Sequence, residues 1–147
     1  MSPLAAAAVV VALVAATTLL GVLWRSRQGR VRTTVHPALV RPSDVGVDGG
    51  FGERATLLQF STEFCAYCPA TRRVLGGLAG ERDGVEHVDI DLTNAPAVAK
   101  RFNVLQTPTT LVLDGAGAIR ARIGGAPRPR ELAERLDQIL GETHVAA

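Results

Sequence analysis

Two cysteines, Cys65 and Cys68, are the residues of this 147-residue chain whose type and spacing could do chemistry. They are its only cysteines, and Ala66 and Tyr67 separate them. A short apolar run ending at Phe60 precedes them and apolar residues at helical spacing follow, so a buried strand is expected to give way to a helix here. Unpaired N–H groups and the helix dipole favour thiolate over thiol at such a position. The second thiol, one turn further along, can reach the first, so the pattern predicts thiol–disulfide chemistry.

A structural zinc site and a pair of inert buried cysteines are the alternatives to this interpretation. Zinc needs four Cys or His ligands. The three histidines, His36, His87 and His144, are scattered and lie far from the cysteines in the sequence. Two inert cysteines would rarely fall at a Cys-x-x-Cys spacing on a strand–helix boundary. Both alternatives are therefore disfavoured.

The N-terminal stretch predicts a membrane-spanning helix. From Leu4 to Trp24 there are 21 residues without a charge, and only Thr17 and Thr18 are polar. As a helix this run would be about 31 Å long, enough for a bilayer core of about 30 Å. A cleaved signal peptide is the rival, but it would need basic residues ahead of a shorter apolar core. A buried soluble helix is the third option, which the lack of a polar face disfavours.

Charge is distributed unevenly along the chain. Residues 25–42 hold five arginines and no acid, whereas residues 43–147 hold eleven basic and all fourteen acidic residues, a formal charge of −3. Because cytoplasmic flanks of membrane helices are rich in Lys and Arg, the C-terminal domain is predicted to be cytoplasmic, on a single-pass cell-membrane protein. The basic segment suits anionic lipid headgroups. The mildly acidic domain with few aromatics argues against nucleic-acid binding.

These features divide the chain into four predicted segments. They are an anchor (1–24), a basic juxtamembrane segment and linker (25–54), a globular domain (55–141) and a C-terminal tail (142–147). Prolines and glycines interrupt the linker, where a short strand or helical turn near residues 45–51 is left open.

The globular segment alternates between strand and helix patterns in the order β-α-β-α-β-β-α. Strands are expected around residues 57–60, 85–90, 109–113 and 118–123. Helices are expected after the cysteines, after Pro96 and from Pro129. Asn103 is expected to end the second helix, and Gly141 the third.

The two cysteines, the order of strands and helices, and Pro108 together make residues 55–141 resemble the thioredoxin-fold thiol–disulfide oxidoreductases. The features that carry the resemblance are the strand Leu57–Phe60 ahead of the cysteines, the Val-Asp-Ile-Asp segment at 88–91, Thr107-Pro108 placed 40 positions after Cys68, and the hairpin followed by Gly124. The layout with an anchor is similar to membrane-anchored members of the family in actinobacteria. The resemblance implies an α/β fold with a mixed central sheet flanked by helices, preceded here by one transmembrane helix.

The resemblance also implies residue roles. Cys65 would be the attacking thiolate, and Cys68 the thiol that resolves the mixed disulfide and releases the partner. A cis bond before Pro108 would turn the chain beside the thiols and leave the backbone of Thr107 free to pair with an extended substrate. Substrate contacts are thus expected at Ala66, Tyr67, Thr107 and Pro108.

Three positions depart from the family pattern. Gln59 stands where thioredoxins bury an acid that takes the proton of the resolving thiol, so deprotonation of Cys68 must use water or another group. Phe64 replaces the tryptophan before the first cysteine, and proline follows Cys68 as Pro69 instead of preceding it. Glu63 is expected on an exposed turn as a solvated acid, with a catalytic role as the less favoured interpretation.

The expected function is that of a membrane-tethered protein-disulfide reductase acting through Cys65 and Cys68, with no cofactor besides this redox-active pair. Its partners would be protein disulfides and an electron donor, for which thioredoxin reductase is one candidate. One alternative is an extracytoplasmic protein that oxidises secreted proteins or reduces apocytochromes. The other is a module that captures a partner or a soft metal such as copper(I) without turnover.

Overall fold

The computed structural model describes residues 2–33 and 38–145. Along the chain it contains α1 (Pro3–Arg27), β1 (Arg32–Thr33), a 3-10 helix (Pro42–Asp44), β2 (Ala55–Ser61), α2 (Cys68–Gly80), β3 (Val85–Asp91), α3 (Pro96–Arg101), β4 (Thr109–Asp114), β5 (Ile119–Gly124) and α4 (Pro129–Val145). From β2 onwards this is the order that the sequence predicts.

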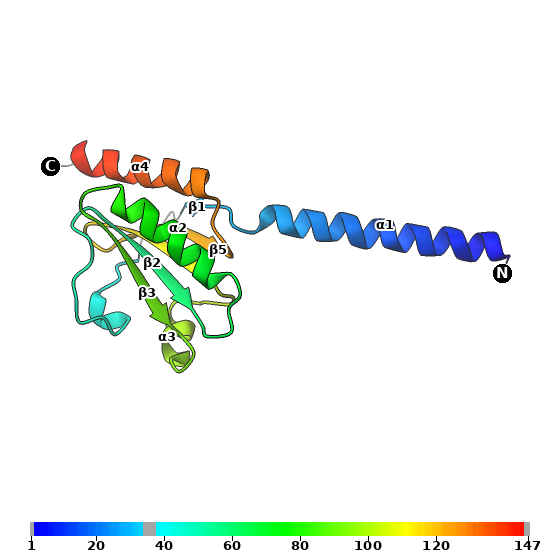
Figure 1. The fold of residues 1–147 in the computed structure, drawn as a ribbon, viewed down its shortest axis with the longest axis horizontal. Helices are drawn as coiled ribbons and strands as arrows, with labels where there is room; N and C mark the ends of the chain where they lie inside the picture. Colours follow the sequence, from blue (N-terminus) through cyan, green and yellow to red (C-terminus); the bar gives the residue numbers. More distant parts are fainter. Residues whose placement is uncertain (1, 34–37, 146–147) are drawn as a thin grey trace.

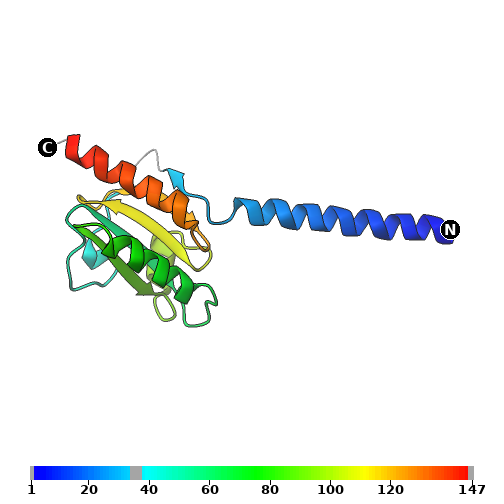
Figure 2. The same cartoon turned by 45° about the horizontal axis from the view of Figure 1, so that its top comes forward.

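The strands form one mixed sheet in the order β1-β5-β4-β2-β3. Strand β2 is parallel to β3 and antiparallel to β4, and β5 is antiparallel to both β4 and β1. Helices α2 and α4 cover one face, and α3 lies on the other (Figures 1 and 2). The predicted thioredoxin fold with a mixed sheet between helices is confirmed.

Strand β2 is buried along its whole length because both faces of the sheet are covered. Successive side chains point to opposite faces. Leu57 packs with α2 and α4 in one apolar cluster, whereas Leu58 and Phe60 pack with the α3 side in the other. The same alternation sends Gln59 to the α2 face, directly below the N-terminus of that helix.

Part of the predicted linker is packed on the domain. Strand β1 pairs with the edge strand β5, and Leu39 forms an isolated bridge with Ala118. Val40 and Val45 are buried in the cluster on the α3 side. Pairing of β1 covers the outer edge of β5, and the two valines remove apolar surface from water.

Helix α4 does not end at Gly141, as the sequence predicts, but continues to Val145. A glycine inside a helix costs only about 1 kcal/mol relative to alanine. Beyond it, Glu142 makes ion pairs with Arg120 on β5 and with Arg135 two turns earlier on α4. These contacts fix the next turn against the sheet and allow the helix to pass the glycine.

Helix α1 stands away from the domain as a single rod (Figure 1). Its segment Pro3–Ser26 has a mean hydropathy of 2.5 and buries none of its surface within the chain, and by length and composition it could cross a membrane. Ser2 begins the helix by accepting a hydrogen bond from the backbone N–H of Ala5.

Candidate active site

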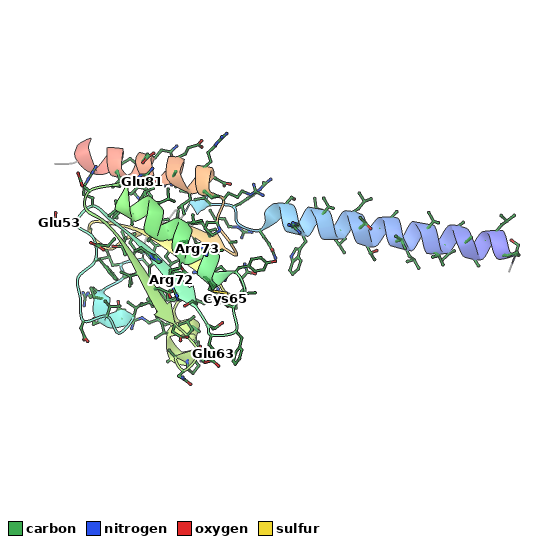
Figure 3. All side chains as sticks on the ribbon, viewed as in Figure 1. Glu53, Glu63, Cys65, Arg72, Arg73 and Glu81 are labelled. Atoms are coloured by element: carbon green, nitrogen blue, oxygen red, sulfur yellow. A yellow bond between two sulfur atoms is a disulfide. The ribbon has the colours of Figure 1, made fainter. Side chains whose placement is uncertain are left out.

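Cys65 and Cys68 form a disulfide between the end of β2 and the first residue of α2. Their Cα atoms are 5.4 Å apart. Cys65 lies partly exposed in the turn before the helix, whereas Cys68 is the first residue of α2 and only 3% exposed. Figure 3 places Cys65 at the end of the domain from which α1 leaves, with Glu53 and Glu81 at the opposite end. The more accessible sulfur is therefore the one predicted to attack.

The local backbone explains why the cysteines meet. The N–H of Cys68 donates to the carbonyl of Cys65 over 3.2 Å, and the N–H of Cys65 donates to the carbonyl of Thr62 over 3.2 Å. These two turns coil the segment so that both sulfurs face each other at the start of α2. Pro69 occupies the first turn of the helix, where its missing N–H would have no helical partner.

The segment around Pro108 closes the site from the side of β4. The Thr107–Pro108 peptide bond is cis, as the resemblance implies, and Pro108 is buried. The hydroxyls of Thr62 and Thr107 share a hydrogen bond of 3.2 Å, which joins the turn before the cysteines to this segment. The carbonyl of Pro108 accepts from the N–H of Gly125 over 2.8 Å. Thr107 and Pro108 are thus fixed next to the turn that leads from Thr62 to the cysteines.

A groove of about 860 Å³ runs from this segment to the end of α1. Tyr67, Thr107 and Pro108 line one part of it, and the α1 residues Trp24 and Arg25 line another. Tyr67 is 68% exposed and so presents its ring to any chain that approaches the disulfide. Ala66 is also exposed, but it is not among the lining residues.

The end of α1 is tied to the strand that flanks the groove. The N–H of Gly29 donates to the carbonyl of Gly124 over 2.9 Å, and Nη2 of Arg128 donates to the carbonyl of Ser26 over 2.8 Å. Gly29 has φ of +71°, and a Cβ there would lie 2.3 Å from the carbonyl oxygen of Ala126. Only glycine allows this close approach, so the residue fixes how α1 meets the domain.

Below Cys68 lies a polar pair that the sequence alone does not bring together. Gln59 is fully buried, and its Nε2 donates to the carbonyl of Cys68 over 3.2 Å. Its Oε1 lies 3.1 Å from Nε2 of His87 on β3. Side chains alternate between the two faces of a strand, so Gln59 and His87 share the α2 face when β2 and β3 pair in parallel. The alternation can be read from the sequence, but the pairing of β2 with β3 cannot.

Charged groups around His87 act on its ionisation in opposite directions. Partial burial lowers the pKa of His87 below its ordinary value of 6.5, Asp89 raises it and Arg72 lowers it further. Arg72 on α2 forms an ion pair with Asp89 on β3. The imidazole is therefore mainly neutral at pH 7, and its protonation midpoint lies below 6.5.

Glu63 and Phe64, two residues just before the cysteines, lie on the outside of the site. Glu63 is exposed, and its backbone N–H donates to the hydroxyl of Thr93 over 3.0 Å. Thr93 in turn hydrogen-bonds Asp91, and these bonds lower the pKa of the Asp91 carboxyl. Phe64 is 87% exposed. Glu63 thus holds the turn through its backbone, and its carboxyl lies on the solvent side.

The chain is similar to proteins of known family over most of the domain. A family model described as a thioredoxin-like domain matches residues 49–140. A thioredoxin from Staphylococcus haemolyticus (strain JCSC1435) is 30% identical over 104 residues, which cover 70% of this chain and 99% of that protein. Thioredoxin C-2 from Corynebacterium nephridii is 32% identical over 87 residues, 58% of this chain and 80% of that protein.

Solved structures show the same similarity. A mutant thioredoxin from Halobacterium salinarum NRC-1 superposes with a TM-score of 0.53 at 20% identity, covering 66% of this chain and 80% of the other. Chloroplastic thioredoxin z gives a TM-score of 0.53 at 25% identity over 59% of this chain and 79% of the other.

Proposed function

Because the chain belongs to the thioredoxin-like family and carries its disulfide-forming cysteine pair, we propose that it is a membrane-tethered protein-disulfide reductase. The observation that carries the proposal is the disulfide between an accessible Cys65 and a buried Cys68, beside the Thr107–Pro108 segment. One thiol is open to an incoming disulfide, and the other is held back where it can attack only the first.

The reaction proceeds in two exchange steps from the dithiol form. The thiolate of Cys65 attacks one sulfur of the substrate disulfide, forms a mixed disulfide and releases the other substrate sulfur as a thiolate. Cys68, once deprotonated, attacks Sγ of Cys65. The bond between Cys65 and the substrate breaks, the second substrate thiolate leaves, and the protein becomes the oxidised form. An external dithiol donor returns two electrons, and a thioredoxin reductase is the first candidate for it.

The position of α1 supports substrates close to the bilayer. A hydrogen bond from Gly29 joins the end of α1 to Gly124 on β5, and one from Arg128, just before α4, holds the carbonyl of Ser26. In Figure 3 the cysteine end of the domain faces the side from which α1 departs. With α1 in the membrane, the groove between Trp24 and Tyr67 opens at the bilayer surface. Disulfides of membrane proteins, or of proteins held near the membrane, would reach it first.

A reduction assay separates the enzyme from a module that captures partners without turnover. The full-length chain in detergent micelles should reduce a generic protein disulfide repeatedly with dithiothreitol as donor. The Cys65→Ser variant, the matched control, should show only the rate of dithiothreitol alone. Binding of one equivalent of partner or copper(I) without repeated reduction would overturn the proposed activity.

The proposed location of the domain is the cytoplasmic side, because arginines flank only the C-terminal end of α1. A reporter fused after Ala147 that works on one side only should be active in the cytoplasm, and external protease should leave the domain intact. Replacing Arg25 and Arg27 with glutamine and inserting two arginines after Ser2 should weaken or invert this orientation.

The matched control for the topology experiment is Arg73→Gln with Arg130→Gln, which removes two exposed charges of the domain and should leave the orientation unchanged. A domain clipped from outside in the unmodified chain would contradict the cytoplasmic location. It would favour the alternative role in oxidation of secreted proteins or reduction of apocytochromes.

A further inference from the structure

We propose that His87 is a positioning residue for the resolving step, whose protonation, transmitted through Gln59, makes Cys68 a better attacking group. The proposal rests on the proposed reductase activity, because it concerns the second of its two exchange steps. It assigns a role to the polar pair that stands where the buried acid of the family is missing.

The hydrogen bonds fix which atoms carry protons. Gln59 donates its Nε2 to the carbonyl of Cys68, so its Oε1 faces His87 as an acceptor. An amide oxygen cannot donate, and Nε2 of His87 must therefore carry a hydrogen in both charge states. The proton that His87 gains in acid binds Nδ1. On α2, a Cβ added to the exposed Gly76 would lie 4.0 Å from Nδ1. Because glycine has no side chain, Gly76 does not cover Nδ1.

The charged groups that face His87 are few among the described residues. Asp89 on its own strand raises its pKa, and Arg72 on α2 lowers it. Strand β2 contributes no charged side chain, since it reads Ala-Thr-Leu-Leu-Gln-Phe-Ser. His87 is thus the titratable side chain that is hydrogen-bonded to Gln59, and Gln59 is the side chain below the backbone of Cys68.

Neighbouring polar atoms make this region suited to a transient charge. Asp89 and Thr110 lie in register with Gln59 on the two adjacent strands and therefore share its face of the sheet. Asp89 Oδ1, Thr110 Oγ1 and Thr71 Oγ1 on α2 are buried without a partner in the described part of the chain. Buried polar atoms of this kind are ordinarily satisfied by water.

Charging His87 should favour the thiolate of Cys68. The imidazolium would strengthen the hydrogen bond to Gln59, which itself donates to the backbone carbonyl of Cys68, a residue that is 3% exposed. In such surroundings a charge acts more strongly than in water. The proton of Cys68 leaves to solvent, its sulfur bonds to Cys65, and the substrate departs as a thiolate. Cys68 is oxidised and the substrate sulfur is reduced, while the sulfur of Cys65 exchanges one disulfide bond for another.

The rate of the resolving step should depend on pH through both Cys68 and His87. In the absence of His87, the rate of the resolving step should fall tenfold for each pH unit below the pKa of Cys68, because only the thiolate attacks. In the unmodified chain, protonation of His87 below its ordinary pKa of 6.5 should counter this fall. A plot of log rate against pH should therefore bend upward in the acid range.

The test mixes the reduced full-length chain in detergent micelles with 5,5′-dithiobis(2-nitrobenzoate) and measures the release of thionitrobenzoate over time. Attack by Cys65 releases the first thionitrobenzoate, and attack by Cys68 releases the second. The His87→Gln variant keeps a side-chain donor for Gln59 but does not titrate. At pH 5 its second phase should be on the order of threefold to tenfold slower than that of the unmodified chain, and equal to it at pH 8.

Two outcomes would overturn the proposal. One is a straight profile in the unmodified chain, and the other is a slowing by His87→Gln that is the same at every pH, which a merely structural role would give. The first phase is the internal control, since it involves Cys65 alone. A chain that releases both thionitrobenzoates with the expected pH profile but does not reduce a protein disulfide would contradict the proposed function. The role of His87 in the attack by Cys68 would still hold.

Unfolding in urea gives a second readout on the oxidised chain. Because burial lowers the pKa of His87, the unfolded state binds the proton first as the pH falls below 6.5. The stability contributed by neutral His87 is complete above 6.5 and declines until the pH has passed the lower folded value. The unmodified chain should lose more stability between pH 7.5 and pH 5 than His87→Gln, and equal losses would mean that His87 is not the group that titrates.

Discussion

The Cys68→Ser variant of the full-length chain should change from a protein that turns over to one that remains covalently attached to its substrates. A serine oxygen cannot displace the substrate from Cys65, so the first exchange step occurs and the second does not. Complexes that disappear with reductant should accumulate on non-reducing gels after alkylation of intact cells. Repeated reduction of a protein disulfide should fall to the background rate.

The matched variant is Cys65→Ser, which should accumulate few such complexes because the buried Cys68 is 3% exposed and cannot meet a large partner. Alkylation of each single variant against pH gives an independent check. Cys65 should react faster at neutral pH, with a pKa below the free thiol value of about 8.5. Complexes formed mainly through Cys68 would reverse the roles assigned to the two cysteines.

The Phe60→Ala variant should lose a large part of the stability of the domain. Phe60 is fully buried in the α3-side cluster, and its ring centroid lies 5.4 Å from that of Phe102. Removing a buried phenylalanine costs about 3–5 kcal/mol, through lost burial and the cavity that remains. The total stability of a small domain is about 5–15 kcal/mol. Guanidinium unfolding of the oxidised chain in micelles should show the midpoint shifted strongly downward.

The control for this experiment is Phe64→Ala, four residues away in the sequence. Phe64 is 87% exposed, so its loss should change the free energy of unfolding by no more than about 0.5 kcal/mol. Equal effects of the two substitutions would mean that Phe60 is not the core residue of the pair.

Much of the fold followed from local patterns. The apolar run to Phe60 and the turn before Cys68 predict the strand and helix that meet at the disulfide, because both elements bury residues with a clear period. The uncharged stretch from Leu4 to Trp24 predicts α1 by its length and nearly continuous apolar composition, although this helix buries none of its surface within the chain. The end of α4 at Gly141 was wrong because glycine is a weak local stop, and the contacts of Glu142 with Arg120 come from another element.

Some features of the candidate site were also predictable from local sequence, and others needed the tertiary structure. By itself the sequence determined the cysteine pair, its place at a helix N-terminus and the proline at 108, since these depend on residue type and on short spacings. Only the tertiary structure decided that β2 and β3 lie side by side, which puts His87 against Gln59. Alternation along a strand says which residues share a face, but it does not say which strand is the neighbour.

The attachment of α1 was likewise decided in three dimensions. Nothing in the spacing of Gly29 and Gly124 indicates that their backbones join, because 95 positions separate them and the hydrogen bond belongs to the backbone, not to a side-chain type. The sequence determined that an apolar helix precedes a redox domain. The fold decided that this helix leaves from the cysteine end, because β1 pairs with β5 beside Pro108 and carries the end of α1 with it.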